Sequence, residues 1–357
     1  MGNNTHKSEL SLEDGSVLEG YSFGSKKSSS GEVVFNTGMV GYPESLTDPS
    51  YRGQILVFTY PLIGNYGVPG YEKEDNLLRY FESDGIQIKG LIIADYSERY
   101  SHWNAKKSLS TWLKEHNIPG IYGIDTRELT KKLRNKGTML GKVTFNNKKI
   151  PLENPNKKNL MKEVSIKEPI LYEKGKKRII LVDCGVKNNI IRAFLRRDFT
   201  VYRVPWDYNF LSEDADGIII SNGPGDPKKC RQTIKNVKEA LSNDTPILGI
   251  CLGSQILALA TGANTYKLKY GHRSHNQPCI ETGSKRCYIT SQNHGYAVDA
   301  ETLPEDWREW FYNNNDGTNE GIIHISKPFF GTQFHPEASP GPDDTEFLFD
   351  MFVRSIK

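Results

Sequence analysis

Residues 246–260 constrain the fold of this chain more than any other stretch. An apolar run of strand length ends at Gly249, a helix-like pattern begins at Ser254, and Cys251 lies in the turn between them. With Gly253 on the other side, the turn has the form G-x-C-x-G, the cysteine version of the nucleophile elbow. Glycine suits both flanking positions because the chain takes unusual dihedral angles there, and because strand and helix pass close together. The stretch therefore predicts a strand–turn–helix unit of an α/β domain.

The position of Cys251 favours a role as a nucleophile. The N–H groups and the positive dipole end of the following helix point at the sulfur and favour the thiolate, which is the reactive form of cysteine. Acyl transfer to the sulfur is the corresponding chemistry. A buried structural cysteine is the alternative, since free cysteines often lie in protein cores. The motif alone does not decide between the two.

Composition indicates a soluble protein of about two domains. The net charge of +3 in 357 residues gives no argument for a nucleic-acid partner, and no apolar run reaches membrane-spanning length. The N-terminus has neither a secretion signal nor an Arg-rich presequence. The five cysteines form no C-x-x-C pair, so we expect no disulfide framework, no metal site and a reducing, cytoplasmic compartment.

The chain divides into three segments by composition and pattern. Residues 1–145 are typical of a β-rich N-terminal domain. Residues 178–357 alternate strand and helix, which predicts a doubly wound, mostly parallel α/β domain. Residues 146–177 are rich in Lys, Asn and Pro and predict a linker with one short pairing segment at 164–166. The predicted fold class is α/β, with a β-rich domain in front.

Local patterns predict the individual elements. A helix is expected over 126–136, because Asp125 and Glu128 have capping-box spacing and Gly137 follows as a stop. The other expected elements are a hairpin at 10–23, strands at 32–35, 54–60, 86–94, 178–182, 200–204, 217–221 and 329–335, shorter antiparallel strands near 288–290, 296–298 and 322–325, and helices at 188–196, 232–241 and 345–355.

His335 is the strongest candidate for a general base among the eight histidines. It lies at the carboxyl end of the predicted strand 329–335, where open α/β sheets place their sites. Glu337 follows two residues later, and in an extended chain residues i and i+2 share a face, so this carboxylate can orient the imidazole. His294 is the rival base, but no carboxylate lies so near it in the sequence.

The loop 221–227, Ser-Asn-Gly-Pro-Gly-Asp-Pro, also ends a predicted strand. Its backbone N–H groups, together with the N–H of Leu252, are candidates for an oxyanion hole. A rigid turn formed by proline and glycine is the alternative interpretation. The loop lacks the G-x-x-x-x-G-K-[ST] pattern, so it is not a phosphate-binding loop.

Taken together, these motifs resemble a known family. Residues 249–253, 221–227 and 334–337 are similar to the three signatures of class I, triad-type glutamine amidotransferases. The N-terminal half, with 276–278 and 293–295, resembles the glutaminase subunit or region of carbamoyl phosphate synthetase. The stretches most similar to its eukaryotic pyrimidine-pathway form are 37–48, 59–67 and 123–133. The resemblance covers nearly the whole chain, apart from the first ten residues and parts of the linker.

The resemblance implies a role for each matching residue. Cys251 would attack the side-chain amide of L-glutamine, His335 would shuttle protons, and Glu337 would orient His335. The residues implied in holding the glutamine are Gly38, Gly223, Gly225, Leu252, Gln255, Asn293, Gly295 and Tyr296. Ammonia would pass to a carbamoyl phosphate synthetase large subunit, or to a covalently following synthetase domain, which would bind ATP and Mg. No cofactor is implied in this chain, and the product would feed pyrimidine or arginine synthesis.

Three positions depart from the family pattern. Gly38 stands where bacterial relatives carry serine, so any contact with glutamine there must come from the backbone. Ser254 replaces the usual histidine before Gln255, and Tyr296 replaces a common phenylalanine. One branch of the family has lost the cysteine and uses free ammonia, and Cys251 together with Gln255 argues against that branch. Two alternatives remain open: a regulatory docking module with incidental glutaminase activity, and a free-standing hydrolase of γ-glutamyl compounds.

Overall fold

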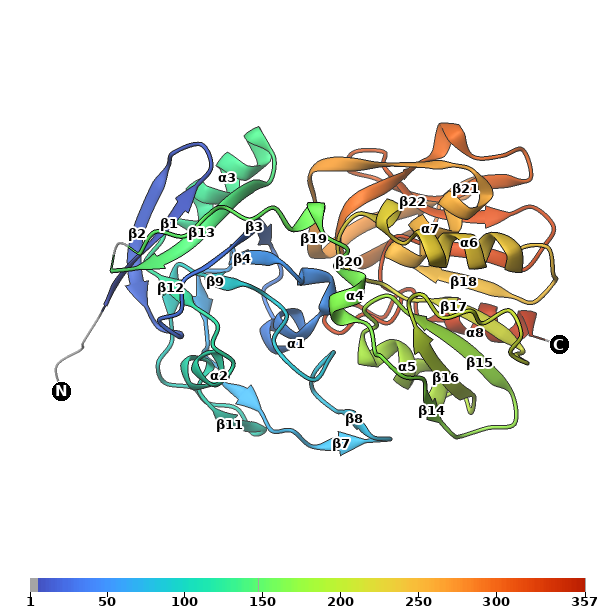
Figure 1. The fold of residues 1–357 in the computed structure, drawn as a ribbon, viewed down its shortest axis with the longest axis horizontal. Coiled ribbons are helices and arrows are strands. Elements are labelled where there is room, and N and C mark those ends of the chain that lie inside the picture. The colour runs from blue at the N-terminus through green and yellow to red at the C-terminus, as the bar shows by residue number, and fades with distance from the viewer. Residues whose placement is uncertain (1–5, 147, 357) are drawn as a thin grey trace. The chain divides into compact units, whose positions relative to one another are not determined.

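The computed structural model describes residues 6–146 and 148–356 (Figure 1). They belong to two compact units, Met1–Lys158 and Asn159–Lys357. Within the described residues, no helix combines the length and the apolarity that crossing a membrane requires.

The first unit is built on a closed barrel, whose described strands follow the order β1-β13-β3-β4-β9-β12-β2. β1 and β2 form the predicted antiparallel hairpin, whereas β3, β4, β9 and β12 pair in parallel. Val34, Leu56 and Leu91, from three adjacent strands, belong to one buried apolar cluster. The barrel strands are β1 (Lys7–Leu12), β2 (Val17–Ser22), β3 (Ser29–Asn36), β4 (Gln54–Phe58), β9 (Gly90–Ile92), β12 (Gly120–Tyr122) and β13 (Met139–Phe145).

Short elements connect the barrel strands. They are α1 (Tyr42–Thr47), a 3-10 helix (Pro49–Tyr51), β5 (Leu62–Ile63), β6 (Val68–Pro69), β7 (Lys73–Glu74), β8 (Leu77–Leu78), β10 (Asp95–Tyr96), β11 (Ala105–Lys107), α2 (Leu109–Glu115) and α3 (Thr126–Lys136). α3 confirms the prediction for 126–136: the Asp125 carboxylate accepts from the N–H of Glu128 at 2.9 Å, and Gly137 ends the helix with a φ of 100°. The strand expected at 86–94 is shorter, because only β9 pairs there.

The second unit contains a mixed sheet with the strand order β14-β16-β15-β17-β18-β23-β22-β21-β19-β20. The strands from β16 to β23 in this order pair in parallel, and antiparallel strands flank them on both sides. The mostly parallel core confirms the predicted fold class. The strands are β14 (Ile170–Tyr172), β15 (Arg178–Asp183), β16 (Thr200–Pro205), β17 (Gly217–Ile220), β18 (Ile247–Ile250), β19 (Asn264–Glu281), β20 (Cys287–Asp299), β21 (Trp307–Asn313), β22 (Asn319–His324) and β23 (Phe329–Thr332).

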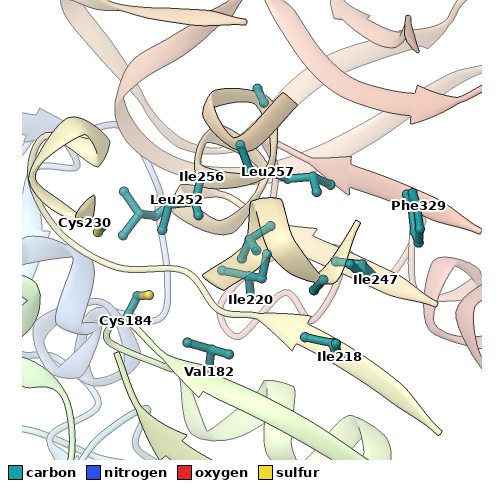
Figure 2. Packing of buried hydrophobic residues seen from close by; sticks show 14 of the residues in the cluster. Val182, Cys184, Ile218, Ile220, Cys230, Ile247, Leu252, Ile256, Leu257 and Phe329 are labelled. Carbon is teal, nitrogen blue, oxygen red and sulfur yellow. The ribbon is translucent and has the colours of Figure 1, made fainter. Parts of the chain in front are cut away.

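Helices cover both faces of this sheet. Leu252 and Ile256 of α7 share one buried cluster with Ile220 of β17 (Figure 2). Phe330 of β23 contacts Phe352 of α8 on the other face, since successive strand residues point to opposite sides and its neighbour Phe329 belongs to the α7 cluster. The helices are α4 (Met161–Val164), α5 (Asn188–Leu195), α6 (Arg231–Ala240), α7 (Leu252–Thr261) and α8 (Phe347–Ser355), with 3-10 helices at Pro155–Lys157, Pro227–Lys229 and Ala300–Thr302.

Several boundary predictions for the second half are wrong. Residues 164–166 do not form a pairing segment, because Val164 ends α4 and the strand of this region is β14. The expected strands near 288–290 and 296–298 are parts of the single strand β20, which pairs along the long strand β19. The strand expected at 329–335 ends at Thr332, so His335 lies beyond it.

Candidate active site

Cys251 lies between β18 and α7, as the G-x-C-x-G pattern predicts. Its φ of 54° and ψ of −105° are unusual for a residue with a side chain, so the turn holds it in a strained conformation. The surrounding backbone fixes this conformation: the N–H of Cys251 donates to the carbonyl of Thr332 at 2.7 Å, and its carbonyl accepts from Ser254 at 3.1 Å. The thiol is therefore presented at the N-terminus of α7 by a rigid turn.

The two flanking glycines permit close contacts that no other residue would allow. A Cβ on Gly249 would lie 2.5 Å from the carbonyl oxygen of Gly253. A Cβ on Gly253 would lie 2.0 Å from the carbonyl oxygen of Ile220, so α7 passes almost against β17 at this point. Both obstacles are backbone atoms, which cannot rotate away as a side chain can.

We expect Gly253→Ala to destabilise the second unit by about 1–3 kcal/mol or more, since the added methyl group must push α7 from the sheet. Any reaction that uses the thiol of Cys251 should slow with it, because Cys251 moves. Gly85→Ala is the control: its methyl group would meet only His116, at 3.8 Å, and should change stability by no more than about 0.5 kcal/mol. Denaturant unfolding of both variants checks this, and equal stabilities would contradict the proposed contact.

His335 and Glu337 meet as predicted, but through a turn instead of a strand. The Nδ1 atom of His335 lies 2.6 Å from Oε1 of Glu337. The chain turns here, because the N–H of Ala338 donates to the carbonyl of His335 at 3.0 Å. The N–H of His335 donates to the carbonyl of Ser291 at 2.9 Å, which anchors this segment on β20. Both side chains are almost fully buried.

Lys187 is a buried partner of Glu337 that the sequence did not reveal. Its Nζ atom lies 3.1 Å from Oε1 of Glu337 and also donates to the carbonyl of Ala338. Burial raises the pKa of Glu337, but Lys187 and His335 outweigh this effect and lower the pKa to about 2. The ionised carboxylate therefore contributes its full share to the free energy of unfolding above its ordinary pKa of 4.5. This contribution is lost as the pH falls toward 2.

The environment of His335 favours its protonated form. Burial lowers its pKa, but the charges of Glu337 and Cys251 outweigh burial and the opposing charge of Lys187, and the pKa rises to about 10. Within the described residues, the Nε2 atom has no hydrogen-bond partner of ordinary geometry. At neutral pH the ring therefore carries a proton that Nε2 can donate, and Glu337 holds it from the opposite nitrogen.

The rival histidine, His294, is engaged elsewhere. Its Nδ1 lies 2.8 Å from the carbonyl oxygen of Tyr296, and its Nε2 lies 3.0 Å from Oε1 of Gln292. Burial, followed by the nearby charge of His272, lowers the pKa of His294 well below its ordinary value. These contacts favour His335 over His294 as the partner of the thiol.

Several predicted glutamine-binding residues lie around the thiol. Sγ of Cys251 is 3.7 Å from the carbonyl oxygen of Asn293. Gln255 does not point its amide nitrogen at an open site, because this atom donates to the carbonyl of Tyr296 at 2.8 Å and to Oε1 of Gln333 at 2.9 Å. Through the first of these hydrogen bonds, Gln255 links α7 to β20. Nε2 of Gln333 lies 3.6 Å from Sγ of Cys251, a contact that sequence reasoning missed.

The loop 221–227 lies beside the start of α7. A Cβ on Gly223 would lie 2.2 Å from the carbonyl oxygen of Cys184 and 2.8 Å from Cδ2 of Leu252, so only glycine fits between them. Gly225 has a φ of 83° and packs against Leu160. The side chain of Leu252 belongs to the apolar core, so its contribution to an oxyanion hole would come from its backbone N–H.

The departures from the family pattern have different structural settings. Ser254 is buried against Gly331. A Cβ added to Gly331 would lie only 2.6 Å from Oγ of Ser254, so the small serine side chain suits this close contact. Gly295 and Tyr296 lie on β20. Gly38 belongs to the first compact unit, where its N–H donates to Oδ1 of Asn36 at 2.6 Å. Its contact with glutamine stays a prediction.

Comparison with known proteins assigns both halves. The family Glutamine amidotransferase class-I matches residues 180–355, and the family Carbamoyl-phosphate synthase small chain, CPSase domain, matches residues 10–143. The arginine-specific small chain of carbamoyl phosphate synthase from Saccharomyces cerevisiae is 51% identical over 371 residues, which cover 100% of this chain and 90% of that protein. The chain belongs to the carbamoyl-phosphate synthase small-chain family.

Longer proteins carry the same family region. Multifunctional protein CAD from Squalus acanthias is 56% identical over 98% of this chain, but the match covers only 16% of that protein. Carbamoyl-phosphate synthase [ammonia], mitochondrial, from Homo sapiens is 51% identical over 97% of this chain and 23% of its own length. The chain therefore spans a fifth or so of these relatives, and nearly all of the yeast small chain.

Proposed function

We propose that this small-chain family member hydrolyses L-glutamine to glutamate and ammonia through a thioester on Cys251, and delivers the ammonia to a synthetase that makes carbamoyl phosphate from bicarbonate and ATP. The observation that carries the proposal is the strained elbow cysteine in electrostatic contact with a histidine, whose Nδ1 lies 2.6 Å from a buried carboxylate. ATP and Mg would bind to the synthetase, and this chain itself would need no cofactor for the hydrolysis.

The first chemical step uses the proton on His335. The Cys251 thiolate attacks the side-chain amide carbon of glutamine, and the carbonyl oxygen becomes an oxyanion near the N–H of Leu252 and the loop 221–227. As the carbon–nitrogen bond breaks, the imidazolium of His335 donates its Nε2 proton to the leaving nitrogen, which departs as ammonia. The products of this step are ammonia and a γ-glutamyl thioester on Cys251.

The second step regenerates the enzyme. His335, now neutral, accepts a proton from a water molecule that attacks the thioester carbon. Glutamate leaves, the thiolate is restored, and the imidazolium reforms beside Glu337. Because Glu337 is held ionised by Lys187, it stabilises the imidazolium in each cycle without itself taking up the proton.

Two observations discriminate against the alternative functions. A regulatory docking module would not need the complete set of Cys251, His335 and Glu337. A free-standing γ-glutamyl hydrolase would not need the first compact unit, Met1–Lys158, which contains the barrel and is called the barrel unit below. The test is ammonia release from glutamine by the chain with its synthetase partner, with mass-spectrometric detection of a γ-glutamyl adduct on Cys251. Absence of both would contradict the proposal.

The synthetase partner would be a separate large subunit or a domain that follows on the same chain, in pyrimidine or arginine synthesis. We propose a cytoplasmic location, which suits the four buried free cysteines and the exposed Cys287.

We expect the barrel unit to carry most of the partner interface, because the family region extends through it although it contributes neither Cys251 nor His335. Removing residues 1–158 should leave an α/β unit that no longer co-purifies with the synthetase. Full-length Cys251→Ala is the control and should still bind. Undiminished binding by residues 159–357 would contradict the expectation.

A further inference from the structure

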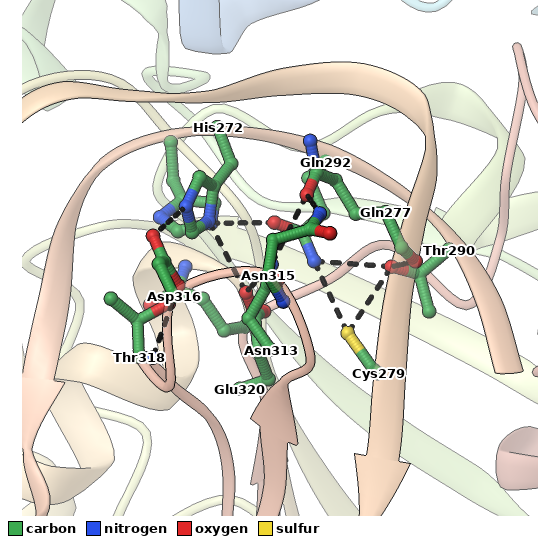
Figure 3. Close-up of polar contacts among 12 residues, drawn as sticks. His272, Gln277, Cys279, Thr290, Gln292, Asn313, Asn315, Asp316, Thr318 and Glu320 are labelled. Carbon is green, nitrogen blue, oxygen red and sulfur yellow. Dashed lines mark hydrogen bonds and ion pairs between the residues drawn. The ribbon is translucent and has the colours of Figure 1, made fainter. Parts of the chain in front are cut away.

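A second cluster of buried polar side chains lies in the α/β unit, next to the predicted glutamine-binding segment of β20 (Figure 3). One possible ligand atom from each of His272, His294 and Glu320 lies within 4.8 Å of the other two. His272 and His294 are opposite each other on β19 and β20, with ring centroids 4.9 Å apart, and Glu320 comes from β22. All three residues are more than nine-tenths buried.

Each of the three side chains has one atom held by a neighbour and one atom left over. Nε2 of His272 lies 2.8 Å from Asp316. Nδ1 of His294 lies 2.8 Å from the carbonyl oxygen of Tyr296. Oε1 of Glu320 accepts from Asn313 at 3.0 Å. Metal-binding histidines and carboxylates show this arrangement, in which an outer partner fixes the orientation and the ligand atom remains available.

Two of the leftover atoms are unpaired. Within the described residues, Nδ1 of His272 and Oε2 of Glu320 have no hydrogen-bond partner of ordinary geometry. Nδ1 lies 3.2 Å from the other carboxylate oxygen of Glu320, Oε1, which Asn313 also contacts. Two ligand atoms about 2.1 Å from one tetrahedral zinc ion are separated by about 3.4 Å, so the imidazole and the carboxylate already lie at a distance that suits a shared ion. The possible ligand atoms lie within 4.8 Å of one another, so the widest separation would have to close by up to about 1.4 Å when the ion binds.

The third leftover atom, Nε2 of His294, faces the side-chain oxygen of Gln292 at 3.0 Å. The neutral ring donates from Nδ1 to Tyr296, so Nε2 is an acceptor that meets another acceptor. Turning the Gln292 amide would place an N–H group against Nε2 of His294, but it would also place the amide oxygen 3.1 Å from Oγ1 of Thr290, whose hydroxyl already donates to the carbonyl of Gln277 at 2.9 Å, and 3.3 Å from Sγ of Cys279. A cation between the two acceptors relieves their contact without moving the amide.

A proton is the competing occupant. His272 can bind one between Asp316 and Glu320: burial lowers its pKa, but the two carboxylates outweigh burial and raise it to about 9. This proton satisfies His272 and leaves the contact between His294 and Gln292 unrelieved. A divalent ion satisfies His272, His294, Glu320 and the amide oxygen of Gln292 together.

We propose that His272, His294 and Glu320, with the amide oxygen of Gln292 as fourth ligand, bind one divalent transition-metal ion of the zinc class. With four protein ligands the site is closed and structural, so the ion does not act on substrate. The ion would link β19, β20 and β22. Its ligand His294 is the neighbour in sequence of Asn293, whose carbonyl oxygen lies 3.7 Å from Sγ of Cys251. The site does not depend on the proposed glutaminase chemistry, because its ligands and its test are separate from that reaction.

The test measures bound metal in the full-length chain. The Cys287→Ser variant serves as background, because Cys287 is an exposed thiol that would bind zinc on its own. After chelator treatment and dialysis, we expect one equivalent of Zn²⁺ by elemental analysis, and Co²⁺ should give the visible absorption of a low-coordinate N/O site without a thiolate charge-transfer band. No stoichiometric binding, or a thiolate band, would overturn the proposal.

Variants locate the site. Glu320→Gln and His272→Asn should abolish the bound equivalent, while circular dichroism verifies that each variant is folded. Asp316→Asn removes only the outer partner of His272 and should weaken zinc affinity about 10–100-fold in a competition with a chromophoric chelator. Asp306→Asn is the matched control: it removes the carboxylate 3.2 Å from His324, an equivalent pair elsewhere in the unit, and should leave affinity unchanged.

Each result of the variant series decides the question. Zinc binding that survives Glu320→Gln and His272→Asn, or that Asp316→Asn and Asp306→Asn weaken equally, would show adventitious binding and overturn the proposal. If the ligand variants do not fold, the stoichiometry and the Co²⁺ spectrum of the background chain decide alone.

Discussion

Cys251→Ala is expected to abolish glutamine-dependent synthesis of carbamoyl phosphate, while the complex with the synthetase still makes product from added ammonia. The sulfur is the atom that would form the thioester, so its removal leaves no covalent route for amide hydrolysis. The synthetase reaction does not use the thiol, so external ammonia can replace the ammonia that this chain would deliver. Rates of product formation with each nitrogen source measure both activities.

Cys287→Ala is the matched control, because it also removes one thiol but at an exposed position. It should keep both activities. Glutamine-dependent synthesis by Cys251→Ala would contradict the assignment of the nucleophile. Loss of both activities in Cys251→Ala would contradict the separation of glutaminase from synthetase chemistry.

The sequence predicted the elbow well because its cause is local. Glycine is required at 249 and 253 because a Cβ there would lie 2.5 and 2.0 Å from backbone oxygen atoms. Both glycines lie within two residues of Cys251. A strand followed by a helix with this spacing leaves few other geometries. The doubly wound sheet follows for a similar reason, since each strand and helix carries its own apolar pattern.

The pairing of His335 with Glu337 was predicted from an incorrect local geometry. An extended strand would place residues i and i+2 on one face, but the strand ends at Thr332 and a turn brings the two side chains together. The separation of two residues constrains the pair in either conformation. The prediction of contact is therefore confirmed, although its reason is wrong.

Contacts that depend on tertiary structure were not accessible to sequence reasoning. Lys187 follows a different strand from Glu337 and is 150 positions away in the numbering, so no motif connects them. His272, His294 and Glu320 are spread over three strands, with no short spacing typical of metal ligands. The barrel was missed because β12 and β9 each have only three residues, too few to show periodicity.

His335→Asn is expected to lower glutaminase turnover by roughly 10²–10⁴-fold, the usual range for a positioned acid–base group. Asparagine retains a similar size but cannot carry a proton to the leaving nitrogen. His324→Asn is the control, since it removes another histidine of the same unit that is paired with Asp306. Near-normal turnover in His335→Asn, with loss in His294→Asn, would assign the base to the rival histidine.

Glu337→Gln tests how the imidazole is held. The amide oxygen can still accept from His335, so its turnover defect near neutral pH should be smaller than that of His335→Asn. The variant also leaves Lys187 as a buried charge without its carboxylate, which should cost about 3–5 kcal/mol of stability. The double variant Lys187→Met/Glu337→Gln removes both charges and should recover part of this loss in denaturant unfolding.

The pH profile separates the two roles of Glu337. In the unmodified chain, activity should fall on the alkaline side, as His335 loses its proton near its raised pKa of about 10. Without the Glu337 carboxylate, burial and Lys187 still lower the pKa of His335, so the alkaline limit of Glu337→Gln should move to lower pH. An unchanged alkaline limit would mean that Glu337 shapes the site without stabilising the imidazolium.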